Sequence, residues 1–253
     1  MKRPKVGFFD FACCEGCQLQ VANFGEELLD ILDVIDVVEF REVMSEKWEG
    51  DFDVAIVEGS ITDKHAVERI KRIRERSKVL IAYGSCATIG GVNGMKNAFD
   101  LTDIRKYVYG SDYKFFKTQM TKALHQVVKV DYFVNGCPIY PPELVKVLKA
   151  ALQGIPYYVP DYAVCVDCRL NENVCMYEKG VTCFGPVTRA GCNSWCVNNG
   201  NICYGCRGIV SNPNEKGMKE VLTKHNIPIE FILNKVNMYN KCRELVEGGE
   251  DDE

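Results

Sequence analysis

The sequence of 253 residues has only three histidines, no long hydrophobic run and no excess of basic charge. No apolar stretch approaches the ~18 residues that a membrane-spanning helix needs, so we expect no transmembrane segment. The net charge of -4 offers no general basic surface for nucleic acid. The basic N-terminus is interrupted by Asp10 and is followed by no small-residue cleavage site, so we expect no export signal and a cytoplasmic protein.

Two nucleotide-binding motifs are also missing. The glycine-rich stretch GSCATIGGVNG, residues 84–94, follows an apolar run, as a phosphate-binding loop would. It contains neither G-x-G-x-x-G nor G-x-x-x-x-G-K-[ST]. The sequence therefore predicts no dinucleotide site and no P-loop on this chain.

Cysteine, in contrast, is abundant, with 14 residues. A reducing cytosol disfavours structural disulfides, so metal binding or redox chemistry is the favoured explanation. The histidines at 65, 125 and 225 are scattered, and none lies beside a cysteine cluster, which disfavours zinc sites rich in histidine. We therefore expect clusters bound by thiolates.

Residues 4–153 alternate short apolar runs with helical patterns, which indicates an α/β fold. Five runs are rich in Val, Ile and Phe, as in strands that are covered on both faces: residues 4–11, 34–40, 52–60, 78–86 and 130–138. We expect a flavodoxin-like, doubly wound parallel sheet over residues 1–158.

Two segments between and after these runs predict helices. In residues 62–77, Thr62 or Asp63 can cap a helix whose apolar stripe includes Ile70 and Ile73. Residues 141–154 begin with two prolines and end at a glycine, as helices often do.

The pattern changes in the second half, which we expect to form a separate domain over residues 159–253. Residues 165–206 hold eight cysteines among many Gly and Asn residues, with little periodicity and too little apolar material for an independent core. An inorganic group is therefore expected to organise this segment. C-terminal helices and an acidic tail, EGGEDDE, should follow.

Four cysteines of the first half follow predicted strands: Cys14, Cys17, Cys86 and Cys137. The carboxyl ends of strands are where open α/β sheets build their sites. Four thiolates match the ligand demand of a 4Fe-4S cluster, and Gly16, Gly84 and Gly136 would let backbone N–H groups approach the sulfurs. Any one cysteine could instead be a small buried residue, but the agreement of three segments favours a site.

The eight cysteines of residues 165–206 are enough for two further clusters of this kind. The alternative is zinc, because two C-x-x-C pairs, 165–168 and 203–206, are typical of a zinc ribbon. A zinc-stabilised interaction module would leave four cysteines unused: Cys175, Cys183, Cys192 and Cys196.

Several motifs together resemble the small, electron-transfer subunit of nickel-iron hydrogenases over nearly the whole chain. They are CEGC at 14–17, VEGS at 57–60, GSC at 84–86, GCP at 136–138, CMYEKGVTCFGPVTRAGCNSWCV at 175–197 and CYGC at 203–206. The resemblance implies three clusters, each held by four cysteines. The proximal ligands would be Cys14, Cys17, Cys86 and Cys137, named here the first set. The distal ligands would be Cys165, Cys168, Cys175 and Cys183, the second set. The medial ligands would be Cys192, Cys196, Cys203 and Cys206, the third set.

Two residues depart from common members of that family. Cys165 stands where periplasmic members have a histidine, and Cys196 stands where many have a proline and a three-iron medial cluster. We therefore expect three 4Fe-4S clusters. The added thiolate charge should lower their reduction potentials, which suits reduction of a nicotinamide.

The related complex I subunit uses two consecutive cysteines, so Cys13 and Cys14 are an alternative ligand pair. The C-x-G-C spacing favours Cys14 and Cys17, which leaves Cys13 as a packed thiol. We expect Glu15 to be a solvated charge rather than a group that tunes the cluster. Cys242, on a helix-like face, should belong to the core.

The sequence lacks the characteristic motifs of the large subunit, among them its terminal D-P-C-x-x-C, so the resemblance implies that hydrogen is split on a partner chain. This chain would relay electrons and looks most like the delta subunit of cytoplasmic NADP-linked hydrogenases, or sulfhydrogenases. Further partners would be iron-sulfur and flavin subunits that reduce NADP, with polysulfide reduction as an associated activity. A small subunit of a hydrogenase that serves a deazaflavin or a heterodisulfide reductase is the alternative.

Overall fold

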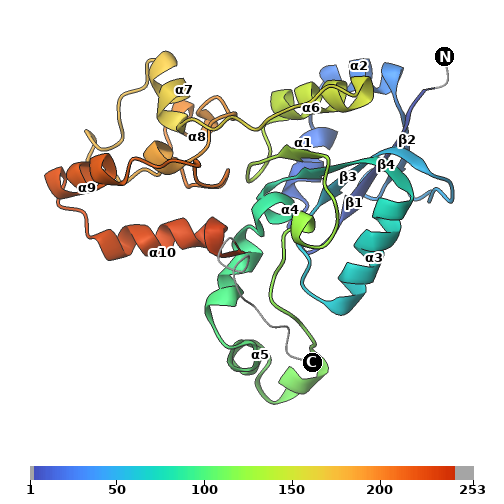
Figure 1. Cartoon of the computed structure of the whole chain (residues 1–253), viewed down its shortest axis with the longest axis horizontal. Coiled ribbons are helices and arrows are strands. Elements are labelled where there is room, and N and C mark those ends of the chain that lie inside the picture. The colour runs from blue at the N-terminus through green and yellow to red at the C-terminus, as the bar shows by residue number, and fades with distance from the viewer. Residues whose placement is uncertain (1–2, 243–253) are drawn as a thin grey trace.

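The computed structural model describes residues 3–242, except for the side chains of residues 27, 28, 30, 215, 229, 231–233 and 236. The predicted acidic tail lies outside the described residues. Five parallel strands form one sheet in the order β2-β1-β3-β4-β5 (Figure 1). They are β1 (Lys5–Asp10), β2 (Asp36–Phe40), β3 (Phe52–Glu58), β4 (Ser77–Tyr83) and β5 (Tyr132–Val134). This order is that of flavodoxin-like folds, which confirms the predicted architecture.

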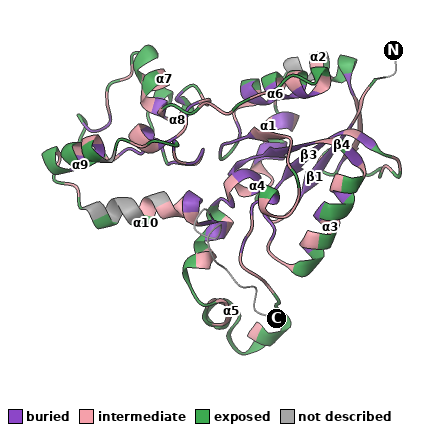
Figure 2. Ribbon diagram, viewed as in Figure 1, coloured by how far each residue is buried: buried purple, intermediate pink, exposed green. Residues whose placement is uncertain are grey.

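Helices cover both faces of the sheet (Figure 1). On one face lie α1 (Gly16–Ala22), α2 (Glu27–Val34) and α6 (Pro141–Gln153), and on the other lies α3 (Lys64–Glu75). Alternate residues of each strand face the two sides, so Val54 and Ile56 pack under α1 and α6, whereas Ala55 and Val57 pack against α3. The central strands β1, β3 and β4 are therefore mostly buried (Figure 2), as their continuous apolar character predicted, whereas the edge strands β2 and β5 are mostly half-buried.

The two predicted helices begin and end as expected. The side chain of Asp63 caps α3 by accepting a hydrogen bond from the N–H of Ala66 at 2.8 Å. The buried face of α3 includes Ile70 and Ile73. Helix α6 begins at its prolines and ends at Gly154, which has a φ of 66°.

The connection from β4 to β5 is longer and irregular. It contains α4 (Ser85–Ile89), η1 (Val92–Ala98), α5 (Leu101–Tyr109), η2 (Gly110–Phe115) and η3 (Leu124–Gln126). Helix α5 and η2 lie away from the sheet (Figure 1) and have no buried residue. This connection puts Cys86 at the start of α4, directly after β4.

The cysteine-rich segment has short helices joined by irregular chain. They are α7 (Val164–Leu170), η4 (Gly185–Val187), α8 (Trp195–Asn198), α9 (Glu215–Lys224) and α10 (Ile229–Asn240). The segment does have a small apolar cluster, contrary to the expectation from residues 165–206 alone. Its members include the thiols of Cys183 and Cys203, and Met218 and Leu222 of α9 complete it. Helix α10 then returns to pack against η1 and α4 (Figure 1).

Among the helices of residues 3–242, none combines the length and the apolar character needed to cross a bilayer.

Candidate metal centre

All fourteen cysteines are free thiols. The four of the first set lie beyond the carboxyl ends of strands, Cys17 and Cys86 in the first turns of α1 and α4 and the other two in loops. The charges of neighbouring thiols act on one another. Burial, with the neighbouring charge of Cys137, raises the pKa of the Cys86 thiol to about 12. The charge of Cys14 also raises the pKa of the Cys86 and Cys137 thiols. Burial also raises the pKa of Cys17, and Cys137 is again among its neighbours. The structure therefore brings the predicted first set into one neighbourhood.

Glu58, at the end of β3, lies directly behind this set. Only 2% of its surface is exposed, and its carboxylate accepts hydrogen bonds from the N–H of Cys17 at 3.2 Å and of Gln18 at 3.0 Å. These N–H groups belong to the first turn of α1, where a carboxylate is favoured. Burial raises the pKa of Glu58, and the two N–H groups oppose that rise.

Gly84 lets the chain pass close to the sulfur of Cys17. A Cβ atom on Gly84 would lie 2.6 Å from that sulfur, and the φ of 83° is one that other residues rarely adopt. The N–H of Ile139 is a hydrogen-bond donor to the same sulfur. The chain at Gly84 thus comes close to a sulfur, but the N–H of Gly84 donates to the carbonyl oxygen of Val134 at 2.8 Å and not to that sulfur. A Cβ on Gly136 would meet the backbone of Pro138.

The second set forms another neighbourhood around α7. Burial raises the pKa of Cys165 to about 12, and the charges of Cys183, Cys168 and Cys175 add to this, in that order. A Cβ on Gly185 would lie 3.2 Å from the sulfur of Cys165 and 3.6 Å from that of Cys183. These two sulfurs therefore both lie close to Gly185, and the N–H of Cys203 donates to the sulfur of Cys183 at 3.2 Å.

The third set lies between the other two. Burial raises the pKa of Cys206 to about 12, and the charged neighbours that add to it are Cys192, Cys137 and Cys196. Cys196 in turn has Cys192, Cys183 and Cys137 as neighbours. Cys137 belongs to the first set, and Cys183, whose sulfur accepts from the N–H of Cys203, belongs to the second, so the third set lies next to both.

Within residues 3–242, no three Cys, His, Asp or Glu side chains are arranged to hold a single metal ion. The two C-x-x-C pairs of the zinc alternative also have different surroundings. Cys168 has Cys183 and Cys175 as neighbours, whereas the neighbours of Cys206 are in the third and first sets. A four-iron cluster is larger than one ion, so its ligands stand farther apart. Twelve free thiols in three neighbourhoods fit the donor chemistry of such clusters.

Three further residues, Cys13, Glu15 and Cys242, are outside the predicted sets, although Cys86 of the first set is among the charged neighbours of Cys13. Cys13 is half-buried, and burial raises the pKa of its thiol to about 12. Glu15 has a φ of 62° and forms a 2.9 Å ion pair with Arg41, which is largely exposed. Cys242 is 3% exposed, as predicted for a core residue, and its sulfur packs against Gly90 and Gly94.

Sequence reasoning missed several residues beside the sets, among them Tyr239 and Arg207. The hydroxyl of Tyr239, on α10, is a hydrogen-bond donor to the thiol of Cys137 and thereby opposes the rise in its pKa that burial causes. Arg207 forms a buried ion pair with Glu143 on α6. Both contacts join residues far apart in the chain, and no local pattern signals them.

The chain matches the family described as NADH ubiquinone oxidoreductase, 20 Kd subunit, over residues 14–151. Sulfhydrogenase 2 subunit delta of Pyrococcus furiosus is 36% identical over 236 residues, which are 93% of this chain and 98% of that protein. One subunit of the F420-non-reducing hydrogenase of Methanocaldococcus jannaschii is 32% identical over 235 residues, which are 81% of each chain. A chain of the NiFeSe hydrogenase of Dm. baculatum has the same fold, with a TM-score of 0.57 at 19% identity, over 87% of this chain and 98% of that chain. The chain therefore belongs to the 20 Kd subunit family and, within it, to the hydrogenase subunits.

Proposed function

We propose that this hydrogenase small subunit relays electrons through three 4Fe-4S clusters, one held by each cysteine set. The observation that carries the proposal is the place of the third set, which has Cys137 of the first set and Cys183 of the second as neighbours. Such an arrangement supports a linear relay in the order first, third, second. A bound 4Fe-4S cluster would supply one-electron chemistry at each set.

The chain's own residues would hold the clusters and exclude water. The thiols must lose their protons to act as ligands. Burial raises the pKa of buried members of each set, such as Cys86, Cys165 and Cys206, so iron binding should release protons. The N–H of Ile139 and the hydroxyl of Tyr239 would remain as hydrogen-bond donors to the sulfurs of Cys17 and Cys137. Cys13 is not assigned as a ligand.

The first and third sets are also joined by backbone contacts. The N–H of Cys137 is a hydrogen-bond donor to the sulfur of Cys206. The hydroxyl of Ser85, next to Cys86, donates to the carbonyl oxygen of Cys206. These contacts connect a predicted proximal segment directly to a predicted medial one, as a relay requires.

The partner for the first set would be the large subunit that carries the nickel-iron site. Cys14 and Cys137 are exposed in this chain, which supports a docking surface at the carboxyl edge of the sheet. Such an interface should be large and obligate. We also infer a division into residues 1–158, with the proximal cluster, and residues 159–253, with the medial and distal clusters.

The relatives bear on what accepts the electrons. The 36% identity to the Pyrococcus furiosus sulfhydrogenase subunit supports an enzyme that passes electrons to NADP through flavin and iron-sulfur subunits in the cytoplasm. The 32% identity to part of an F420-non-reducing hydrogenase favours the second candidate, an enzyme that serves a heterodisulfide reductase. The subunits that copurify with the native protein distinguish the two.

The test is the iron, acid-labile sulfide and zinc content of the anaerobically purified native complex. After the partners' clusters are subtracted, about twelve iron and twelve sulfide per chain support three four-iron clusters. Zinc without iron would refute the relay and leave the zinc-stabilised module.

A further inference from the structure

A buried ion pair joins the cysteine-rich segment to the sheet-bearing part of the chain. The side chains of Arg207 and Glu143 are 1% and 3% exposed. The contact is bidentate, with Nη1 2.6 Å from Oε2 and Nη2 2.7 Å from Oε1. Removing two charges from water is so unfavourable that an apolar pair is often at least as stable. Stability alone therefore does not account for this pair.

The guanidinium of Arg207 also holds two segments that carry predicted ligands. Its Nε donates to the carbonyl oxygen of Ala190 at 2.7 Å, two residues before Cys192. Its Nη1 donates to the carbonyl oxygen of Asn135, two residues before Cys137. Arg207 itself follows Cys206 directly, so one side chain fixes segments of the third and first sets.

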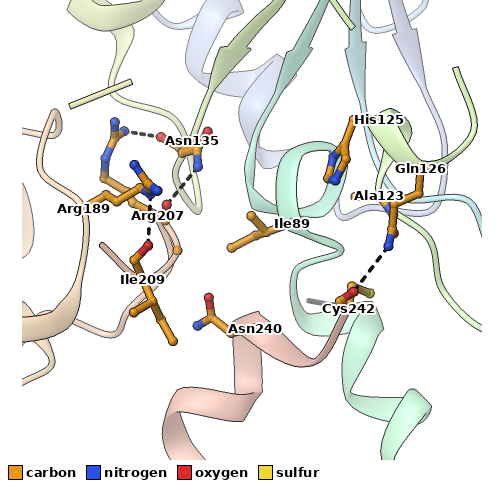
Figure 3. A pocket seen from close by; sticks show the side chains of 11 residues that line it. Ile89, Ala123, His125, Gln126, Asn135, Arg189, Arg207, Ile209, Asn240 and Cys242 are labelled. Carbon is orange, nitrogen blue, oxygen red and sulfur yellow. Dashed lines mark hydrogen bonds between the residues drawn. The ribbon is translucent and has the colours of Figure 1, made fainter. Parts of the chain in front are cut away.

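Further hydrogen bonds run from the sheet-bearing part of the chain to the segment around Arg207. Arg207 and Asn135 lie together in the wall of a cavity (Figure 3), whose volume is about 220 Å³. The amide of Asn135 donates to the carbonyl oxygen of Arg207 at 2.8 Å. The N–H of Ser85 donates to the carbonyl oxygen of Gly136 at 2.7 Å. The hydroxyl of Tyr157 donates to Glu143 at 2.9 Å, so the carboxylate has a further partner besides the arginine. Hydrogen bonds therefore fix both the segment around Asn135 and the segment around Arg207 where the two parts of the chain meet.

We propose that the Arg207–Glu143 pair is a positioning device that fixes the third cysteine set against the first and thereby sets the gap that electrons must cross. The inference rests on the proposed function. Electron tunnelling slows steeply with distance, so a small displacement of either set matters. The rigid, planar fork of arginine defines distance and direction together, which a lysine ammonium does not.

Two variants separate positioning from charge and from stability. Arg207→Lys keeps the positive charge but loses the fork. The double variant Arg207→Met with Glu143→Met removes the fork without leaving a lone buried charge. Arg189→Lys is the matched control, because Arg189 contacts Asp161 at 2.6 Å and the carbonyl oxygen of Ile209 at 3.0 Å, both within the cysteine-rich segment.

Each variant is purified as the native complex and measured in three ways. Iron and sulfide content reports assembly, and the magnetic interaction between reduced clusters in EPR spectra reports their separation. Electron delivery from hydrogen to the final acceptor is compared with isotope exchange between hydrogen and water, which needs no net electron transfer.

We expect both test variants to weaken the magnetic interaction and to slow electron delivery roughly tenfold or more. Their rate of isotope exchange should equal that of the wild type, and the Arg189→Lys complex should match the wild type in all three measurements. Loss of third-set iron alone, with the first-set signal retained, supports the same role. Full iron with unchanged coupling and rate in either variant would overturn it, and so would general unfolding of both. Wild-type protein without iron would instead refute the proposed function, before any variant is compared.

Discussion

The carboxylate of Glu58 accepts a hydrogen bond from the N–H of Cys17 at 3.2 Å, although the two residues lie 41 positions apart. The contact links the end of β3 to the first turn of α1. It places a buried negative charge beside a predicted cluster ligand. Burial is the main cause of the raised pKa of the Cys17 thiol, and the charge of Glu58 is the second.

Glu58→Gln should therefore raise the reduction potential of the first-set cluster, because the loss of a nearby negative charge favours the reduced, more negative state of the cluster. The amide oxygen keeps an acceptor for one of the two N–H groups of α1, which bond to different oxygens of Glu58. Glu15→Gln is the control, since Glu15 is partly exposed and paired with Arg41, so solvent screens its charge. Redox titration followed by EPR measures both variants; a potential for Glu58→Gln at or below that of Glu15→Gln would contradict the assignment.

Gly84→Ala tests the close approach to Cys17. The added Cβ would lie 2.6 Å from the sulfur, and the residue would have to adopt a φ of 83°. We therefore expect the free energy of unfolding to fall by about 1–3 kcal/mol, and we expect the variant to lose iron from the first set. Gly110→Ala controls for backbone strain alone, because its φ is 57° and nothing lies within 4 Å of the added Cβ. Urea midpoints and iron content should separate the two variants, and equal losses would show that contact with the sulfur is unimportant.

The sheet was predictable because its strands are covered on both faces and so consist of unbroken apolar runs, as in Val54–Val57. Helix α6 could be predicted equally well, because two prolines mark its start and Gly154 marks its end. The contacts between distant segments were not. Arg207 and Glu143 are 64 positions apart, and neither a buried arginine nor a buried glutamate differs in sequence from an exposed one. The apolar cluster around Cys183 was missed because α9 supplies part of it.

Cys196→Ala tests the ligand that departs from the common family pattern. We expect iron to fall from about twelve to about eleven per chain and a three-iron signal to appear in the oxidised state, because the third set then offers three thiolates. Cys13→Ala should keep the full iron content. If Cys13→Ala loses iron while Cys196→Ala does not, the ligand assignments at both positions are wrong.

His125 predicts loss of stability in mild acid. Burial lowers its pKa, opposed by a hydrogen bond to the backbone of Thr88. As the pH falls below about 6.5, the unfolded chain binds a proton that the folded chain resists, so the free energy of unfolding decreases. His125→Asn should flatten this dependence between pH values of about 7.5 and 5.5, as measured by urea midpoints. The same change at exposed His65 is the control, and an equal effect of both changes would contradict the prediction.

Reduction by hydrogen tests the central claim most directly. The oxidised native complex is exposed to hydrogen without any other reductant, and EPR follows the clusters of this chain. The relay predicts that all three clusters become reduced and that replacing Cys137 with alanine leaves the second and third sets oxidised under hydrogen while dithionite still reduces them. Clusters reduced by dithionite but not by hydrogen in the unaltered complex would contradict the account.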